Sequence, residues 1–191
     1  GTFFAGGQLS GQIGYILMGI GVAAYLGAEG SVGLAGATYH TINHALFKAA
    51  LFLVAGAVFF HTGEVKLYRM GGLWRRMPVT ALVGLIAAFG IAGVPLFNGY
   101  ISKTLLHHAI MEAAEFSHLR LLFTAERLFM LTGAGTACSF IKFYYLIFLR
   151  APQRDYGKIK ESRAMQASML ALMAAIVLLG VFPHFFLDKL M

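Results

Sequence analysis

Hydrophobic residues in this chain gather into long runs that short polar segments separate. The runs cover roughly residues 7–26, 38–60, 79–111, 128–149 and 164–186. A helix needs about 20 mostly apolar residues to cross the hydrocarbon core of a membrane. We therefore predict an all-α polytopic membrane protein with about five transmembrane helices in a single domain over residues 1–191.

The third run, residues 79–111, is too long for one regular crossing. Its middle reads GIAGVPLFNG, residues 90–99. Glycine, proline and Asn-Gly so close together interrupt a helix, so we predict a discontinuous helix, broken near Gly93–Asn98. Non-helical backbone occurs at membrane depth only where it is buried in protein or lines a wet cavity. We therefore expect a polar cavity beside this break.

Composition agrees with a membrane protein. The chain is 59% hydrophobic and 12% charged, whereas soluble domains are usually about 25% charged. The net charge of +7 does not indicate nucleic acid, because the basic residues fall mostly in two loops, residues 61–78 and 150–163. Basic loops stay in the cytoplasm. This places the N-terminus and both loops in the cytoplasm and the C-terminus outside, in a multi-pass protein of the cell (inner) membrane.

Isolated polar residues in the first and fourth runs have simpler interpretations. The polar positions of the first run are expected to make helix–helix hydrogen bonds; they are Gln8, Ser10, Gln12 and Tyr15. Cys138 is the only cysteine, which excludes a disulfide within the chain. We expect it to be a buried, inert thiol.

A stripe of ionisable residues crosses the second run. His40, His44 and Lys48 are spaced four residues apart, so they share one helical face. Lys48 lies roughly 15–18 Å of helix from the two ends of the run. Ionisable groups at membrane depth are costly and often mark ion pathways, and imidazole passes protons between waters near neutral pH. The stripe therefore predicts a proton relay.

Other interpretations of the stripe stay open. Lys48 could pair permanently with a carboxylate from elsewhere, and the histidines could be core residues bonded to backbone. Histidines at this spacing can also chelate zinc, but a third ligand and a general base are needed. No suitably placed glutamate follows His40, so we expect no metal site.

Three further basic residues are candidate proton-transfer groups. Lys103 follows the predicted break by about one turn, and His107 follows Lys103 by another. Lys142 lies in the fourth run, two turns before Arg150, where its stem could instead reach the membrane surface. Lys103 could likewise be an interfacial lysine. No catalytic residue, cofactor motif or cofactor-binding residue is predicted in this chain.

The same stretches resemble a known family. HTINHALFKAALFLVAGAVFFHTGE (residues 40–64) and MGGLWRRMPVTALVGLIAAFGIAGVPLFNGYISK (70–103) resemble the antiporter-like proton-translocating subunits. That family includes the antiporter-like subunits of complex I (NADH:quinone oxidoreductase), Mrp cation/proton antiporters and the membrane subunits of membrane-bound hydrogenase and formate hydrogenlyase. SGQIGYILMGIG (10–21) and CSFIKFYYLIFL (138–149) resemble flanking helices of the same family.

The resemblance implies a division of roles. Family members contain two inverted five-helix repeats, and this chain resembles the second only. Lys48 would match the lysine of the unbroken helix, and Lys103 the charged residue of the broken one. His40 and His44 would match the bridging histidines. The first repeat, with its Glu–Lys pair, is expected in a partner membrane subunit. Iron–sulfur clusters, flavin or a NiFe site are expected in peripheral redox subunits, with lipid around the chain.

The function expected from these features is translocation of an ion, most simply a proton, within a redox-driven complex of the complex I or membrane hydrogenase type. Such a chain would be part of an oxidoreductase without holding its redox centre. The first alternative is a subunit of an Mrp-type cation/proton antiporter. The second is a structural scaffold subunit without a conduction path of its own.

Overall fold

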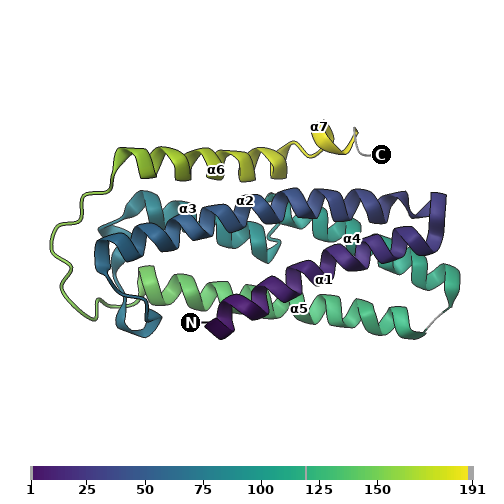
Figure 1. The fold of residues 1–191 in the computed structure, drawn as a ribbon, viewed down its shortest axis with the longest axis horizontal. Coiled ribbons are helices and arrows are strands. Elements are labelled where there is room, and N and C mark those ends of the chain that lie inside the picture. The colour runs from purple at the N-terminus through teal and green to yellow at the C-terminus, as the bar shows by residue number, and fades with distance from the viewer. Residues whose placement is uncertain (1, 119, 189–191) are drawn as a thin grey trace.

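The computed structural model describes residues 2–118 and 120–188, with side chains described from residue 11 onward. This part of the chain is all-helical (Figure 1). The α-helices are α1 (Thr2–Leu26), α2 (Ser31–Thr62), α3 (Pro78–Ala92), α4 (Asn98–Ser117), α5 (Arg120–Tyr144), α6 (Arg163–Val181) and α7 (His184–Leu187). A π-helical turn, Tyr145–Leu149, continues α5.

The long helices lie roughly along one direction (Figure 1). Helices α1 and α2 run antiparallel, joined by a short 3₁₀ turn, Gly27–Gly30. Three stretches are long and apolar enough to cross a membrane: Gly11–Thr62, which holds most of α1 and all of α2, Arg120–Leu149, and Arg163–Val181. The apolar helix α3 is shorter. The chain is therefore a multi-pass membrane protein.

Two helices begin earlier than the hydrophobic runs suggested. Helix α2 begins at Ser31 instead of near residue 38. Gly33 and Gly36 lie within this helix, where they allow close packing of neighbouring helices. A Cβ atom on Gly33 would lie 2.8 Å from the carbonyl oxygen of Gly19 in α1. Helix α5 begins at Arg120 instead of near residue 128, and Leu122 in its first turn packs on the cluster between α1 and α4.

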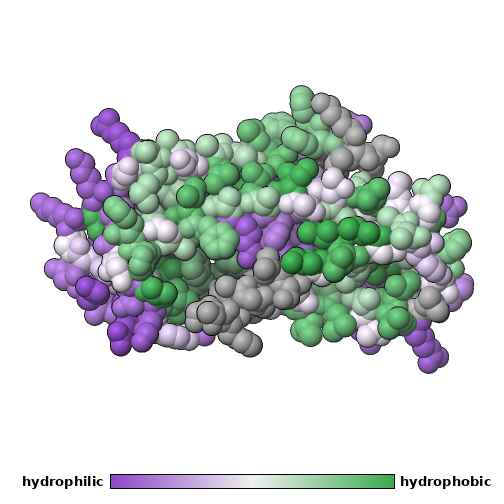
Figure 2. Space-filling view, viewed as in Figure 1, coloured by the Kyte–Doolittle hydropathy of each residue, from purple (hydrophilic) through white to green (hydrophobic). Residues whose placement is uncertain are grey.

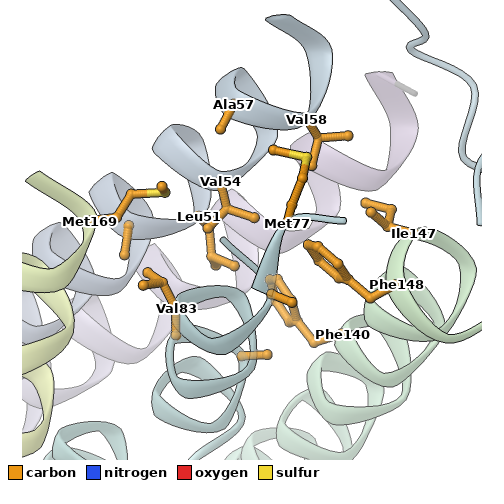
Figure 3. Packing of buried hydrophobic residues seen from close by; sticks show 14 of the residues in the cluster. Leu51, Val54, Ala57, Val58, Met77, Val83, Phe140, Ile147, Phe148 and Met169 are labelled. Atoms are coloured by element: carbon orange, nitrogen blue, oxygen red, sulfur yellow. The ribbon is translucent and has the colours of Figure 1, made fainter. Parts of the chain in front are cut away.

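The main apolar core lies where α2, α3, α5 and α6 meet (Figure 3). Val54 of α2 and Val83 of α3 are fully buried in it, and so is Phe148 of the π-helical turn. Met169 brings α6 onto the same cluster. This core holds α3 firmly against α2, which carries the predicted relay residues.

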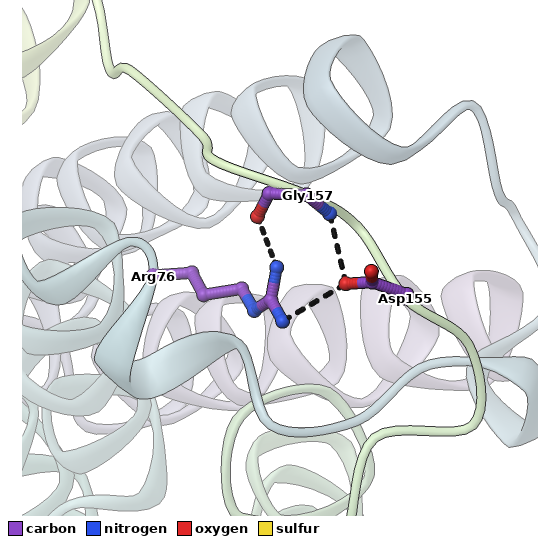
Figure 4. Close-up of polar contacts among 3 residues, drawn as sticks. All are labelled: Arg76, Asp155 and Gly157. Carbon is purple, nitrogen blue, oxygen red and sulfur yellow. Dashed lines mark hydrogen bonds and ion pairs between the residues drawn. The ribbon is translucent and has the colours of Figure 1, made fainter.

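Both basic loops lie at the same end of the bundle and are bonded to each other. Arg76 donates hydrogen bonds to the carbonyl of Gly157 and to the carboxylate of Asp155 (Figure 4). The Gly157 N–H and then the Arg76 guanidinium hold the pKa of Asp155 below its usual value. Glu161 accepts hydrogen bonds from the Thr80 N–H and hydroxyl, which satisfies the first turn of α3.

The expectation that Cys138 is buried was wrong. Its side chain is exposed on the outside of α5. An apolar residue of a membrane protein can face either the protein interior or the lipid. A position within an apolar run therefore does not imply burial inside the fold.

Candidate functional site

The interruption between α3 and α4 is the centre of the candidate site. Helix α3 ends at Ala92, Gly93 adopts a left-handed conformation with φ of 81°, and α4 begins at Asn98. The Lys103 ammonium reaches back across this break and donates to the carbonyls of Ile91, at 2.8 Å, and Ala92, at 3.3 Å. The C-terminus of a helix carries a partial negative charge, so α3 itself stabilises the Lys103 cation.

A pair of buried asparagines holds the interruption against α2. The Asn43 amide donates to the backbone carbonyl of Asn98 at 2.9 Å, and the Asn98 amide donates to the side-chain oxygen of Asn43 at 3.0 Å. Both side chains are fully buried. The break is thus fixed by specific bonds from a neighbouring helix, as buried non-helical backbone requires.

Glycines allow the close contacts around the same segment. A Cβ atom on Gly99 would collide with the carbonyl oxygen of Gly90, and one on Gly180 of α6 would collide with the carbonyl of Leu96. The broken segment is therefore packed backbone to backbone on α3 and α6.

His40 joins three helices. One of its ring nitrogens, Nδ1, lies 2.8 Å from the Ser102 hydroxyl of α4, and the other, Nε2, lies 3.0 Å from the Gln12 side-chain oxygen of α1. The Ser102 hydroxyl also donates to the carbonyl of Gly99 at 3.2 Å. An amide oxygen only accepts, so Nε2 donates its proton to Gln12, whereas the Ser102 hydroxyl can either accept from Nδ1 or donate to it.

His44 and Lys48 lie further along α2 and are only partly buried. The His40 and His44 rings are parallel, with centroids 6.4 Å apart. The buried His44 Nε2 has no hydrogen-bond partner among the described residues. Figure 2 shows a hydrophilic patch midway along the molecule with apolar surface on both sides of it, in the region that α2 crosses in Figure 1.

A cavity of about 410 Å³ lies beside the break, between α1, the start of α4 and α5. Lys103, Thr104 and His107 give it a polar wall. Its other lining residues are Tyr15, Ala92, Gly93, Tyr100, Phe129, Met130, Gly133 and Ala134. On its far side the His107 Nε2 lies 3.1 Å from a carboxylate oxygen of Glu126 in α5.

The structure brings most of the predicted residues into one region, in two groups. Lys103 and His107 share the cavity, and His40 contacts Ser102, the residue before Lys103. His44 and Lys48 continue along α2 at helical spacing. Lys142 lies apart: it is exposed, with its ammonium 5.4 Å from the Tyr68 ring of the first basic loop.

Sequence reasoning missed Asn43 and Glu126 as members of the site. Asn43 lies one turn after His40, so the period of α2 could have indicated it. Glu126 precedes the predicted fourth run, residues 128–149, because that prediction did not include the early start of α5 at Arg120. The helix–helix role predicted for Gln12 and Tyr15 is confirmed, since Tyr15 donates to the carbonyl of Phe129 in α5. Gln8 and Ser10 lie outside the described side chains.

Within residues 2–118 and 120–188, no group of three or more His, Cys, Asp or Glu side chains is placed to hold a metal ion. The polar atoms around the break are instead backbone carbonyls, amides, a hydroxyl, imidazoles and lysine. Such groups bind and pass protons and waters.

Comparison with known proteins identifies the family. Residues 10–130 match the family model described as NADH:quinone oxidoreductase/Mrp antiporter, TM. Hydrogenase-4 component B of Escherichia coli is 32% identical over 190 residues, covering 94% of this chain and 28% of the relative. Na⁺/H⁺ antiporter subunit A1 of Staphylococcus haemolyticus is 34% identical over 189 residues, covering 90% of this chain and 23% of the relative.

A solved structure shares the fold. One chain of the membrane-bound sulfane sulfur reductase, an archaeal respiratory membrane complex, superposes with a TM-score of 0.76 at 25% identity, covering 99% of this chain and 34% of that one. This chain thus spans about a quarter of the length of the curated relatives it matches. It belongs to the NADH:quinone oxidoreductase/Mrp antiporter transmembrane family, as an antiporter-like membrane subunit of the complex I, hydrogenase and Mrp type.

Proposed function

We propose that this chain translocates protons within a redox-driven membrane complex. The observation that carries the proposal is the position of Lys103, whose ammonium lies at a helix interruption, is bonded to backbone carbonyls and lines a cavity with Thr104 and His107 on one otherwise apolar wall. A lysine whose bonds are all to neutral groups can release its proton without leaving a carboxylate unpaired.

The proposed path uses the residues that the sequence indicated. His44 and Lys48 exchange protons on α2, His40 connects α2 to the start of α4 through Ser102, and Lys103 delivers protons to the cavity that His107 lines. Helices α1, α2, α3 with α4, α5 and α6 form five crossings that resemble the second inverted repeat of the family. Lys142 has a separate place in this scheme, near the basic loops, where it can serve proton entry.

The proposed partners follow from the exposed part of the α2 stripe. His44 and Lys48 are only partly covered by this chain, and charged groups are not left facing lipid. We propose that a membrane segment carrying the Glu–Lys pair of the first repeat covers them. Redox centres such as iron–sulfur clusters, flavin or a NiFe site would belong to peripheral subunits of the complex.

Orientation is a further part of the proposal. The basic loops at residues 61–78 and 150–163 lie together at one end of the bundle (Figure 1), which the positive-inside rule assigns to the cytoplasm. The N-terminus is then cytoplasmic and the C-terminus lies outside.

Transport by the complete complex in membrane vesicles tests the proposal. Lys48→Ala and Lys103→Ala should each lower proton transport by roughly 100-fold, the scale of loss when a proton-transferring group is removed. Lys66→Ala is the matched control, because Lys66 is an exposed loop lysine. Assembly is followed by the amount of complex purified. Normal transport in both variants would overturn the proposal and favour a scaffold role.

A secondary cation/proton antiporter is the second candidate, which the 34% identity to an Na⁺/H⁺ antiporter subunit favours. The same relay residues would serve it. Purification of the native complex separates the two functions: redox subunits with bound cofactors should accompany the chain in the first case, and Na⁺-driven proton exchange without such subunits supports the second.

A further inference from the structure

A carboxylate lies inside a stretch of α5 that is long and apolar enough to cross a membrane. Glu126 is in the second turn of α5, within this stretch, Arg120–Leu149. Its side chain is 22% exposed, and its Oε1 lies 3.1 Å from the His107 Nε2. Ionisable groups at such positions are rare and tend to be functional.

The pair stands at one side of the cavity that Lys103 lines. His107 lines this cavity together with Lys103 and Thr104, and it follows Lys103 by four residues, about 6 Å along the helix. Helix α4 runs from the interruption toward the end of the bundle opposite the basic loops (Figure 1). Lys103, the cavity, His107 and Glu126 are therefore arranged in series toward that end.

We propose that His107 and Glu126 together are the terminal proton acceptor of this cavity. The inference rests on the proposed function, since it requires Lys103 to release protons into the cavity. Lys103 gives a proton to cavity water, that water passes a proton to the lone pair on His107 Nδ1, and the proton on Nε2 passes to Glu126 Oε1. His107 is then neutral again as the other tautomer, and Glu126 is a neutral acid that releases its proton to water at the membrane surface.

The alternative is a hydrogen bond that only fastens α4 to α5. His107 already packs against α5 without this bond, since the Phe129 ring of α5 lies 6.1 Å from the His107 ring. A fastening role predicts that variants lower stability and transport together. A proton-accepting role predicts that transport falls while the complex remains assembled.

Transport measurements on the complete complex in vesicles separate these roles. Glu126→Gln keeps the size and one hydrogen-bond acceptor but cannot take up a proton, so proton transport should fall roughly tenfold or more. His107→Gln should cause a similar loss, and the double variant little further loss, because the two residues act as one unit. Glu115→Gln is the matched control, since Glu115 is an exposed glutamate in the last turns of α4.

Dicyclohexylcarbodiimide labelling of the wild-type complex provides a readout that needs neither a variant nor transport. This apolar reagent attacks protonated carboxyl groups within membranes. Mass spectrometry should find Glu126 modified well ahead of the exposed Glu112 and Glu115. Equal slow labelling of all three would overturn the inference, whether or not Glu126→Gln assembles.

The outcomes also distinguish failure of this inference from failure of the proposed proton-translocating function. If Lys103→Ala abolishes transport while Glu126→Gln transports normally, the terminal acceptor is wrong and the relay stands. If Lys103→Ala transports normally, the relay itself fails, even where Glu126 labels rapidly.

Discussion

Lys103 shows how one side chain can be charged inside a membrane protein without a carboxylate partner. Its ammonium donates to the carbonyls of Ile91 and Ala92, the last residues of α3, and lies 5.5 Å from the Tyr15 ring. Carbonyl oxygens at a helix end and an aromatic face both favour a cation. A buried lysine therefore needs no acidic partner in the sequence, because backbone carbonyls at a helix end can supply the counter-charge.

The buried asparagine pair gives a residue-scale prediction. Asn43→Leu keeps the volume of the side chain but leaves the amide of Asn98 without its acceptor. An unsatisfied buried amide costs about 1–3 kcal/mol, so the variant should unfold at lower temperature or lower denaturant in detergent.

The control for Asn43→Leu is Thr41→Val. Thr41 is on the exposed side of the same helix, and among the described residues its hydroxyl bonds to the carbonyl of Ala37. Loss of that local bond should change the free energy of unfolding by no more than about 0.5 kcal/mol. Equal effects of the two variants would show that the asparagine pair does not hold the break.

The sequence located the ionisable residues but not their partners. His40 and Lys103 stand out as ionisable residues within apolar runs, which the sequence alone reveals. The atoms that bind His40 come from positions 28 and 62 residues away, in Gln12 and Ser102. Polar residues of this kind are common in membrane helices, and only the packing of α1, α2 and α4 selects which of them meet.

Among the elements, the interruption of the third run was the most predictable. Glycine and proline remove helix hydrogen bonds locally, so their effect can be deduced from neighbouring residues. The start of α5 was not predictable in the same way. Its first turns are amphipathic, and they are helical because Leu122 packs on the cluster between α1 and α4, a contact between distant parts of the chain.

The close approach of α3 and α4 gives an element-scale prediction. Gly99→Ala would place a methyl group on the carbonyl oxygen of Gly90, so the two half-helices must separate. Overpacking of this kind costs roughly 1–3 kcal/mol, and detergent unfolding should show it. Gly56→Ala in α2 is the control, because nothing lies within 4 Å of the added methyl.

The two glycine variants should change the free energy of unfolding in opposite directions. Alanine stabilises a helix relative to glycine by about 0.5–1 kcal/mol where there is space, so Gly56→Ala should be neutral or more stable than the wild type. A Gly99→Ala protein as stable as Gly56→Ala would mean that the contact between the half-helices is not close in solution.

On the scale of the whole molecule, the two ends of the bundle differ in charge and in construction. At one end the basic loops are fastened to each other through Arg76, Asp155 and Gly157 (Figure 4), and this end is hydrophilic in Figure 2. The other end holds the Gly27–Gly30 turn and the connection from α4 to α5, with exposed Glu29, Glu112 and Glu115. This asymmetry is a property of the assembled loops that no single segment of sequence displays.

The asymmetry leads to a prediction about sidedness. In a background with Cys138 replaced by serine, cysteines are introduced at the exposed positions Gln153 and Ala28, at opposite ends of the bundle. A membrane-impermeant maleimide added to intact cells should label Ala28→Cys but not Gln153→Cys, because basic loops are retained in the cytoplasm. The reverse pattern would mean that the protein lies in the membrane the other way round. The proposed relay through Lys103 and His107 would then have to take protons up from the cytoplasm instead of releasing them outside.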